Sequence, residues 1–96
     1  MKFVQAIEFR GSKEEFERLM DRYQAIVGAE TTVRSARLFE DRDEPGVFVE
    51  LVEFDSYESA MANSEHPGTQ RWAQEAAAVF RQAKFGNWNV VGEYTV

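Results

Sequence analysis

His66 is the residue of this sequence best suited to acid–base chemistry. It is the only histidine, and imidazole is the one side chain that changes charge near neutral pH by default. Pro67 follows it, and a residue before proline disfavours helical backbone, so a helix should break here. At such a break His66 could accept a proton from a phenolic substrate. The alternative is a partly exposed histidine in a loop or at a helix cap.

Arg37 and Glu50 interrupt otherwise apolar segments. Residues 32–40 and 47–54 both have the pattern of strands, and the turn-forming residues 41–46 join them as a hairpin. A pivot in the middle of this turn places Arg37 directly across from Glu50. Because buried charges persist when they are paired, we predict an ion pair in the sheet or at a subunit seam. The functional alternative is an arginine that orients a carbonyl or enolate, with Glu50 holding it.

Several other side chains could bind a planar ligand, because aromatic rings stack on flat molecules and amides bind their polar groups. Trp72 is the best placed, since it follows the break at His66 by one to two helical turns. The predicted substrate-binding residues are Tyr23, Phe48, Glu50, Asn63, Trp72 and Trp88, with Gln5 and Phe80 as further candidates. The alternatives are a place in the core for each ring, a dimer contact for Gln5 and a helix C-cap for Asn63.

The sequence lacks the signatures of a bound metal or cofactor. It has no cysteine, and one histidine among scattered acids does not make a metal site. No glycine-rich phosphate loop, dinucleotide fingerprint or nucleophile elbow is present. We therefore expect no metal and no cofactor.

Hydrophobic periodicity predicts four strands, at residues 2–9, 32–40, 47–54 and 88–95. They alternate with helical segments in the order βαββαβ. We expect a single α+β domain over residues 1–96, with a ferredoxin-like fold: a four-stranded antiparallel sheet with the helices on one face.

The helical segments carry their own start and stop signals. A capping box at Ser12 and Glu15 opens a helix over residues 13–27, and Gly28 is placed to end it. The second helical region is split by the break at His66. Its two parts are predicted at about residues 55–63 and 69–83.

The charge of the chain limits its partners. The formal net charge is −6, and no basic face is visible that could bind nucleic acid or an anionic membrane. No apolar run is long enough to span a bilayer, and the first residues do not resemble a signal peptide. We expect a cytoplasmic protein without nucleic-acid or membrane partners.

The third predicted strand is apolar on both faces. Val47, Val49 and Leu51 lie on one face, and Phe48, Val52 and Phe54 lie on the other. Helices cover only one face, and large exposed apolar patches are uncommon on monomers. A second copy packed face to face would cover the other side, so we expect a homodimer. The alternative is a monomer with an open hydrophobic face.

One segment resembles a known family. Residues 48–60, FVELVEFDSYESA, followed by residues 63–67, NSEHP, and by Trp72, resemble the antibiotic biosynthesis monooxygenase-like proteins of the dimeric α/β-barrel superfamily. The likeness in topology covers nearly the whole chain. It implies a ferredoxin-like subunit that dimerises through its sheet.

The family resemblance leaves several activities open. Members include cofactor-free oxygenases of polycyclic aromatics and quinols, haem-degrading oxygenases, isomerases, decarboxylases and proteins without known activity. The haem-degrading branch is the least similar: it has an asparagine in the first strand and a tryptophan before a histidine. Here the first strand has no asparagine, and His66 precedes Trp72.

These observations favour a small enzyme that acts on a hydrophobic, aromatic or enolisable molecule. We expect a cofactor-independent monooxygenase-like protein with His66 and Arg37 as catalytic residues, and an isomerase or cyclase fits the same residues. The alternative is a non-catalytic module that binds a small ligand or a partner. An open pocket with His66 and a polar partner in reach would favour the enzyme, whereas a filled core would favour the binder or a structural role.

Overall fold

The computed structural model describes all residues 1–96. Its strands are β1 (Phe3–Arg10), β2 (Val33–Glu40), β3 (Val47–Phe54) and β4 (Arg81–Asn89). Its helices are α1 (Lys13–Ile26), α2 (Tyr57–Glu65) and α3 (Pro67–Val79), with a short 3-10 turn at Gly28–Glu30. The elements follow one another as βαββαβ, with the second helical region in two parts.

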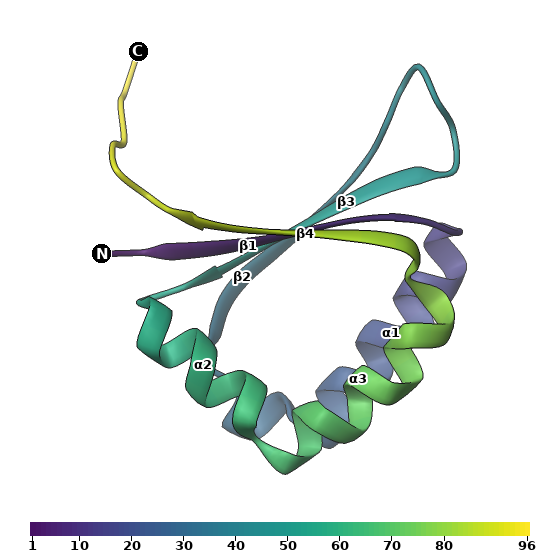
Figure 1. Cartoon of the computed structure of the whole chain (residues 1–96), viewed down its shortest axis with the longest axis horizontal. Coiled ribbons are helices and arrows are strands. Elements are labelled where there is room, and N and C mark those ends of the chain that lie inside the picture. Colours follow the sequence, from purple (N-terminus) through teal and green to yellow (C-terminus); the bar gives the residue numbers. More distant parts are fainter.

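The four strands form one antiparallel sheet in the order β2-β3-β1-β4. All three helices lie on one side of this sheet, and nothing covers the other side (Figure 1). The predicted fold class, a ferredoxin-like α+β fold, is confirmed.

The sequence signals at the start of α1 act as expected. The Ser12 hydroxyl oxygen accepts a hydrogen bond from the Glu15 amide at 3.2 Å, which satisfies one of the free amides of the first turn. Phe16 and Leu19 are the buried residues of the helix and turn towards the sheet. Gly28, however, is not a C-cap: the chain continues directly into the 3-10 turn.

The junction between α3 and β4 differs from the prediction. The helix ends at Val79, not at Ala83, and the last strand covers residues 81–89 instead of 88–95. The ring centroids of Phe80 and Phe9 are 4.7 Å apart, so the chain turns here to pack Phe80 against the core. Gln82 takes a positive φ of 55° at the turn into the strand, next to the register shift between β1 and β4. Residues 90–96 follow β4 as a tail that leads away from the sheet (Figure 1).

Gly86 lies within β4, opposite Ala6 of β1. A Cβ atom there would lie 3.1 Å from the ring of Trp88. Glycine therefore leaves room for the indole to lie along the strand.

The hydrophobic core is divided into two clusters. Phe3, Val52, Phe54 and Ala60 pack under α2, while Ile7, Phe9, Phe16 and Phe48 pack under α1 and the end of α3. On β3, Glu50 lies between Phe48 of one cluster and Val52 of the other. The core is thus interrupted where a carboxyl group faces the helices.

Candidate functional site

A cavity of about 440 Å³ lies between the sheet and the helices. Its floor comes from β1, β2 and β3, and its roof from α1, α2 and α3. Most of its wall is apolar: Ile7, Met20, Val33, Ala36, Val52, Phe54, Ala60 and Met61. Exposed lining residues, including Gln24 and Ser64, mark where the cavity meets solvent. Its size and apolar lining are typical of small-molecule sites.

Glu50 is the ionisable group at the floor of this cavity. It is only 3% exposed, and its neighbours across the strands are Ile7 on β1 and Leu38 on β2. Its carboxyl group has no hydrogen-bond or ion-pair partner. Burial alone raises the pKa of Glu50 to about 7, because an apolar environment disfavours the charged form. At neutral pH this carboxyl group can therefore both give and take a proton.

Trp72 and Tyr23 form an aromatic corner of the wall. Their rings meet edge to face, with centroids 5.1 Å apart. The indole nitrogen of Trp72 donates a hydrogen bond to the Leu19 carbonyl oxygen at 2.8 Å, which fixes α3 against α1. Because that donor is used, Trp72 offers a ligand its ring surface and not its N–H group.

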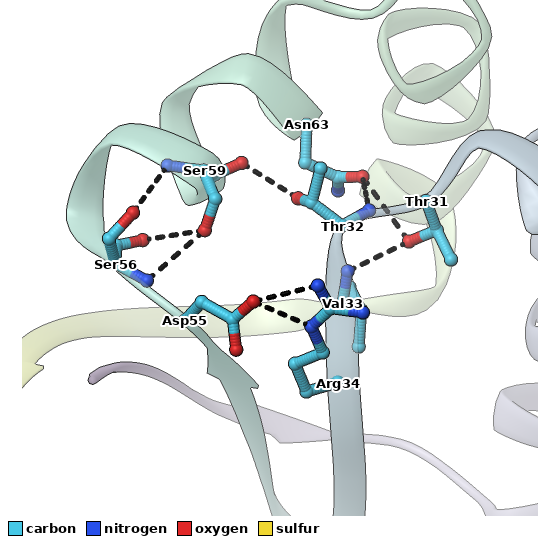
Figure 2. Close-up of polar contacts among 8 residues, drawn as sticks. All are labelled: Thr31, Thr32, Val33, Arg34, Asp55, Ser56, Ser59 and Asn63. Carbon is cyan, nitrogen blue, oxygen red and sulfur yellow. Dashed lines mark hydrogen bonds and ion pairs between the residues drawn. The ribbon is translucent and has the colours of Figure 1, made fainter.

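Asn63 is the centre of a polar network beside this corner. Its Oδ1 accepts a hydrogen bond from the Thr32 amide at 3.2 Å, and its Nδ2 donates to the Tyr23 hydroxyl at 3.1 Å. The Tyr23 hydroxyl also lies 2.6 Å from the Thr31 hydroxyl. Figure 2 shows the Asn63 side chain reaching from α2 to the backbone just before β2. The network joins α1, α2 and β2 at one end of the cavity.

Two further polar groups line the cavity without partners. The Thr69 hydroxyl is buried and makes no hydrogen bond, and the Gln5 amide lies on the same sheet face as Glu50, diagonal to it. Gln5 was among the predicted hydrogen-bonding residues. Thr69 was missed, since a threonine in the first turn of a helix carries no signal of its own.

Arg34 stands at the mouth of the cavity, where β2 has a bulge. Its guanidinium group donates to the Asp55 carboxylate, with Nη2–Oδ2 and Nε–Oδ2 distances of 2.7 and 2.8 Å (Figure 2). Each partner shifts the other's pKa towards the charged form: the pKa of Asp55 is lowered and that of Arg34 is raised. The one cationic side chain at the cavity is therefore already paired.

Comparison with solved structures identifies the fold. A variant of SnoaB, a cofactor-independent oxygenase from Streptomyces nogalater, superimposes with a TM-score of 0.79 at 17% identity, covering 96% of this chain and 95% of that one. Rv0793 from Mycobacterium tuberculosis gives 0.70 at 16% identity, over 99% and 100% of the two chains. A protein named as an antibiotic biosynthesis monooxygenase gives 0.63 at 22% identity, over 96% and 100%. The chain has the fold of the antibiotic biosynthesis monooxygenase-like proteins. No family model and no curated protein matches its sequence.

Within this monooxygenase-like fold, His66 does not lie where the sequence placed it. It caps α3: its Nδ1 accepts a hydrogen bond from the Gly68 amide at 3.0 Å. With Nδ1 as acceptor, the proton belongs on Nε2, which lies 2.9 Å from the Glu30 carboxylate. The basic nitrogen is thus occupied, and His66 does not line the cavity. The prediction that its imidazole stands at the rim of the pocket is wrong, and its alternative, a helix-capping histidine, is what the structure shows.

Arg37 is also placed elsewhere. Its partner across the hairpin is Leu51, and Leu38 lies opposite Glu50. Arg37 therefore points to the uncovered face of the sheet, where its guanidinium carbon lies 4.9 Å from the centroid of the Phe39 ring. The predicted Arg37–Glu50 ion pair is wrong, because the two side chains are on opposite faces.

The structure divides the remaining predicted ligand-binding residues. Tyr23, Glu50, Asn63 and Trp72 line the cavity together. Phe48 is buried in the core and Trp88 lies opposite Val4 on the uncovered face, so neither borders the cavity.

No group of three or more histidine, cysteine, aspartate or glutamate side chains is arranged to hold a metal ion. None of the helices has the length and apolar character needed to cross a membrane.

Proposed function

We propose that this protein binds a hydrophobic, aromatic or enolisable small molecule in the cavity and acts on it as a cofactor-independent monooxygenase-like enzyme. The observation that carries this proposal is the cavity itself, about 440 Å³ with an apolar wall, an aromatic corner and a few polar groups. A filled core would have favoured a structural role.

Cofactor-independent oxygenation requires the protein mainly to bind the substrate and to transfer a proton. A reduced aromatic substrate can itself supply the electrons that activate oxygen, so the site needs to orient the ring, exclude water and accept a proton. The aromatic corner of Tyr23 and Trp72 and the carboxyl group of Glu50 are suited to these tasks. The name of SnoaB as a cofactor-independent oxygenase agrees with this proposal.

The proposal is tested by offering the purified protein a panel of anthrones, hydroquinones and phenols. Oxygen uptake and mass spectrometry detect turnover, and calorimetry detects binding. We expect turnover of at least one reduced aromatic compound. Binding without turnover would support the alternative, a non-catalytic ligand-binding module, and absence of both would contradict the proposed function.

A matched pair of variants links any binding to the cavity. Ser64→Phe places a ring at the mouth, whereas Glu65→Phe places the same ring on an exposed position of α2 that does not line the cavity. Binding should weaken in Ser64→Phe and stay unchanged in Glu65→Phe.

We also propose that the protein is a homodimer joined through the uncovered face of the sheet. That face presents Phe39, 39% exposed, and Trp88, 56% exposed, around the half-buried Val49 and Leu51. The tail after β4 adds exposed apolar side chains. A second copy of the same face would bury these side chains.

A further inference from the structure

We propose that Glu50 is the proton-accepting residue of the cavity, and that its ligand is a neutral phenol or enol and not a carboxylate or phosphate. This inference rests on the proposed function, because it assumes that the cavity holds a hydrophobic small molecule.

The position of Glu50 points to a ligand and not to a structural pairing. Its neighbours along the strand, Phe48 and Val52, and across it, Ile7 and Leu38, are all apolar. A buried carboxylate that stabilised the fold would have a cation or several donors beside it. Glu50 has neither, and its carboxyl group borders a cavity.

The other charges around the cavity disfavour an anionic ligand. Of the elements that surround Glu50, α1 contributes one titratable lining residue, Tyr23, and β2 contributes Arg34; β1, α2 and α3 contribute none. The Tyr23 hydroxyl is held by Thr31 and Asn63, and Arg34 is paired with Asp55 at the mouth. An anion would meet the carboxylate in a site of low polarity without a free cation to offset the repulsion.

A neutral hydroxyl group fits this environment. It can donate a hydrogen bond to the carboxylate while its ring packs on the apolar wall, and Gln5 and Thr69 remain available for other polar atoms of the ligand. In the proton transfer, the ligand O–H bond breaks and its electron pair stays on the ligand oxygen. A new O–H bond forms on a Glu50 carboxylate oxygen, so the site carries one negative charge before and after the step.

Burial favours this exchange. The pKa of Glu50, about 7, lies closer to the pKa of a phenol than the pKa of an exposed glutamate does. The proton therefore moves from the phenol to Glu50 against a smaller free-energy difference. The ligand anion that results is delocalised over its ring.

The experiment compares three naphthalene probes of similar size: 2-naphthol, 2-methoxynaphthalene and 2-naphthoate. Calorimetry measures their affinity at several pH values in the wild type, in Glu50→Gln and in Glu53→Gln. Glu53 is on the same strand but on the opposite face, so its variant controls for the loss of a negative charge.

In the wild type, the affinity for 2-naphthol should rise about tenfold between about pH 6 and pH 8, because the binding-competent carboxylate fraction grows through the pKa of Glu50. The affinity for 2-methoxynaphthalene should fall over the same range, since it cannot donate to the carboxylate. Naphthoate should bind most weakly. Both pH dependences should vanish in Glu50→Gln and persist in Glu53→Gln.

A second measurement needs no variant at Glu50 to fold. In carbon-13 spectra of the wild type, 2-naphthol should lower the titration midpoint of the Glu50 carboxyl group and 2-methoxynaphthalene should raise it. The role of Glu50 is overturned if the probes bind with affinities that do not change with pH and without shifting this midpoint. In that case the cavity remains a ligand site. If no probe binds to the wild type, the proposed function fails, and this inference fails with it.

Discussion

Glu50 should make the fold less stable as the pH rises. Its pKa is 4.5 in the unfolded chain and about 7 in the folded protein, so between these values the folded state holds a proton that the unfolded state has released. The free energy of unfolding then falls by about 1.4 kcal/mol per pH unit, about 3 kcal/mol over the whole window. Glu50→Gln removes this loss. Urea denaturation should show the variant gaining up to about 3 kcal/mol on the wild type between pH 4.5 and pH 7, with a constant offset above.

Glu53→Gln is the control for that measurement, because Glu53 is on the opposite face of the same strand. It should show no such gain. A difference between Glu50→Gln and the wild type that is the same at every pH would contradict the role of burial.

Asn63→Ala should destabilise the junction between α2 and β2. The variant leaves the Thr32 amide and the Tyr23 hydroxyl without their amide partner, and an unpaired group at a buried site costs about 1–3 kcal/mol. Denaturation of Asn63→Ala is compared with that of Ser64→Ala, an exposed neighbour that should change stability by less than about 0.5 kcal/mol. Equal stability of the two variants would show that the hydrogen bonds of Asn63 do not stabilise the fold.

Residue types predicted part of the cavity lining but not the roles. Tyr23, Asn63 and Trp72 were predicted from the chemistry of their side chains, and Trp72 also from its place after the helix break. The structure brings all three together with Glu50. His66 was predicted from the usual acid–base chemistry of imidazole, but nothing in its residue type shows that a helix amide already occupies its basic nitrogen.

Arg37 was misplaced by one position in the hairpin. The register pairs Arg37 with Leu51, whereas a pivot in the middle of the turn pairs it with Glu50. A shift of one residue reverses the face on which every side chain of a strand lies. The charged residues therefore indicated correctly that the apolar pattern of the strands is interrupted, but not which face of the sheet each charge lies on.

At the scale of elements, the sequence predicted the starts of the helices better than their ends. Ser12 and the helix break before Pro67 are local signals, and both are found in the structure. The end of α3 has no such signal, because the residues after Val79 include alanine and glutamine, which favour helices. Pairing of β4 with β1 and the packing of Phe80 decide the boundary, and these contacts between distant parts of the chain override propensity.

His66→Ala should weaken the start of α3 without affecting the cavity. Loss of the side chain that accepts from the Gly68 amide should cost about 1 kcal/mol, typical of an N-cap. His66→Ser supplies another capping oxygen and should recover most of that stability. Thermal denaturation measures both variants, and binding of 2-naphthol should be equal in both once they are folded. If His66→Ser is as stable as the wild type but does not bind 2-naphthol, the imidazole takes part in ligand binding after all.

At the scale of the whole molecule, the sheet has one face packed by helices and one face left open (Figure 1). The two predicted sets of apolar residues on β3 lie on opposite faces of the sheet. Phe48, Val52 and Phe54 are buried under the helices, and Val47, Val49 and Leu51 point to the other side. The apolar residues of β3 that the single layer of helices does not cover therefore lie on this open face.

Leu51→Glu should separate the proposed dimer into folded monomers. Leu51 is half-buried on the central strand β3, and a second copy of the face would enclose it, so a carboxylate there would lose its hydration without gaining a partner. Sedimentation velocity should give twice 11.1 kDa for the wild type at micromolar concentration and 11.1 kDa for the variant. Gln74→Glu, with the same charge at an exposed position of α3, should remain dimeric, and circular dichroism should confirm that both variants are folded. A wild type that sediments as a monomer would contradict the dimer, and a Leu51→Glu variant that stays dimeric would place the interface elsewhere than on this face of the sheet.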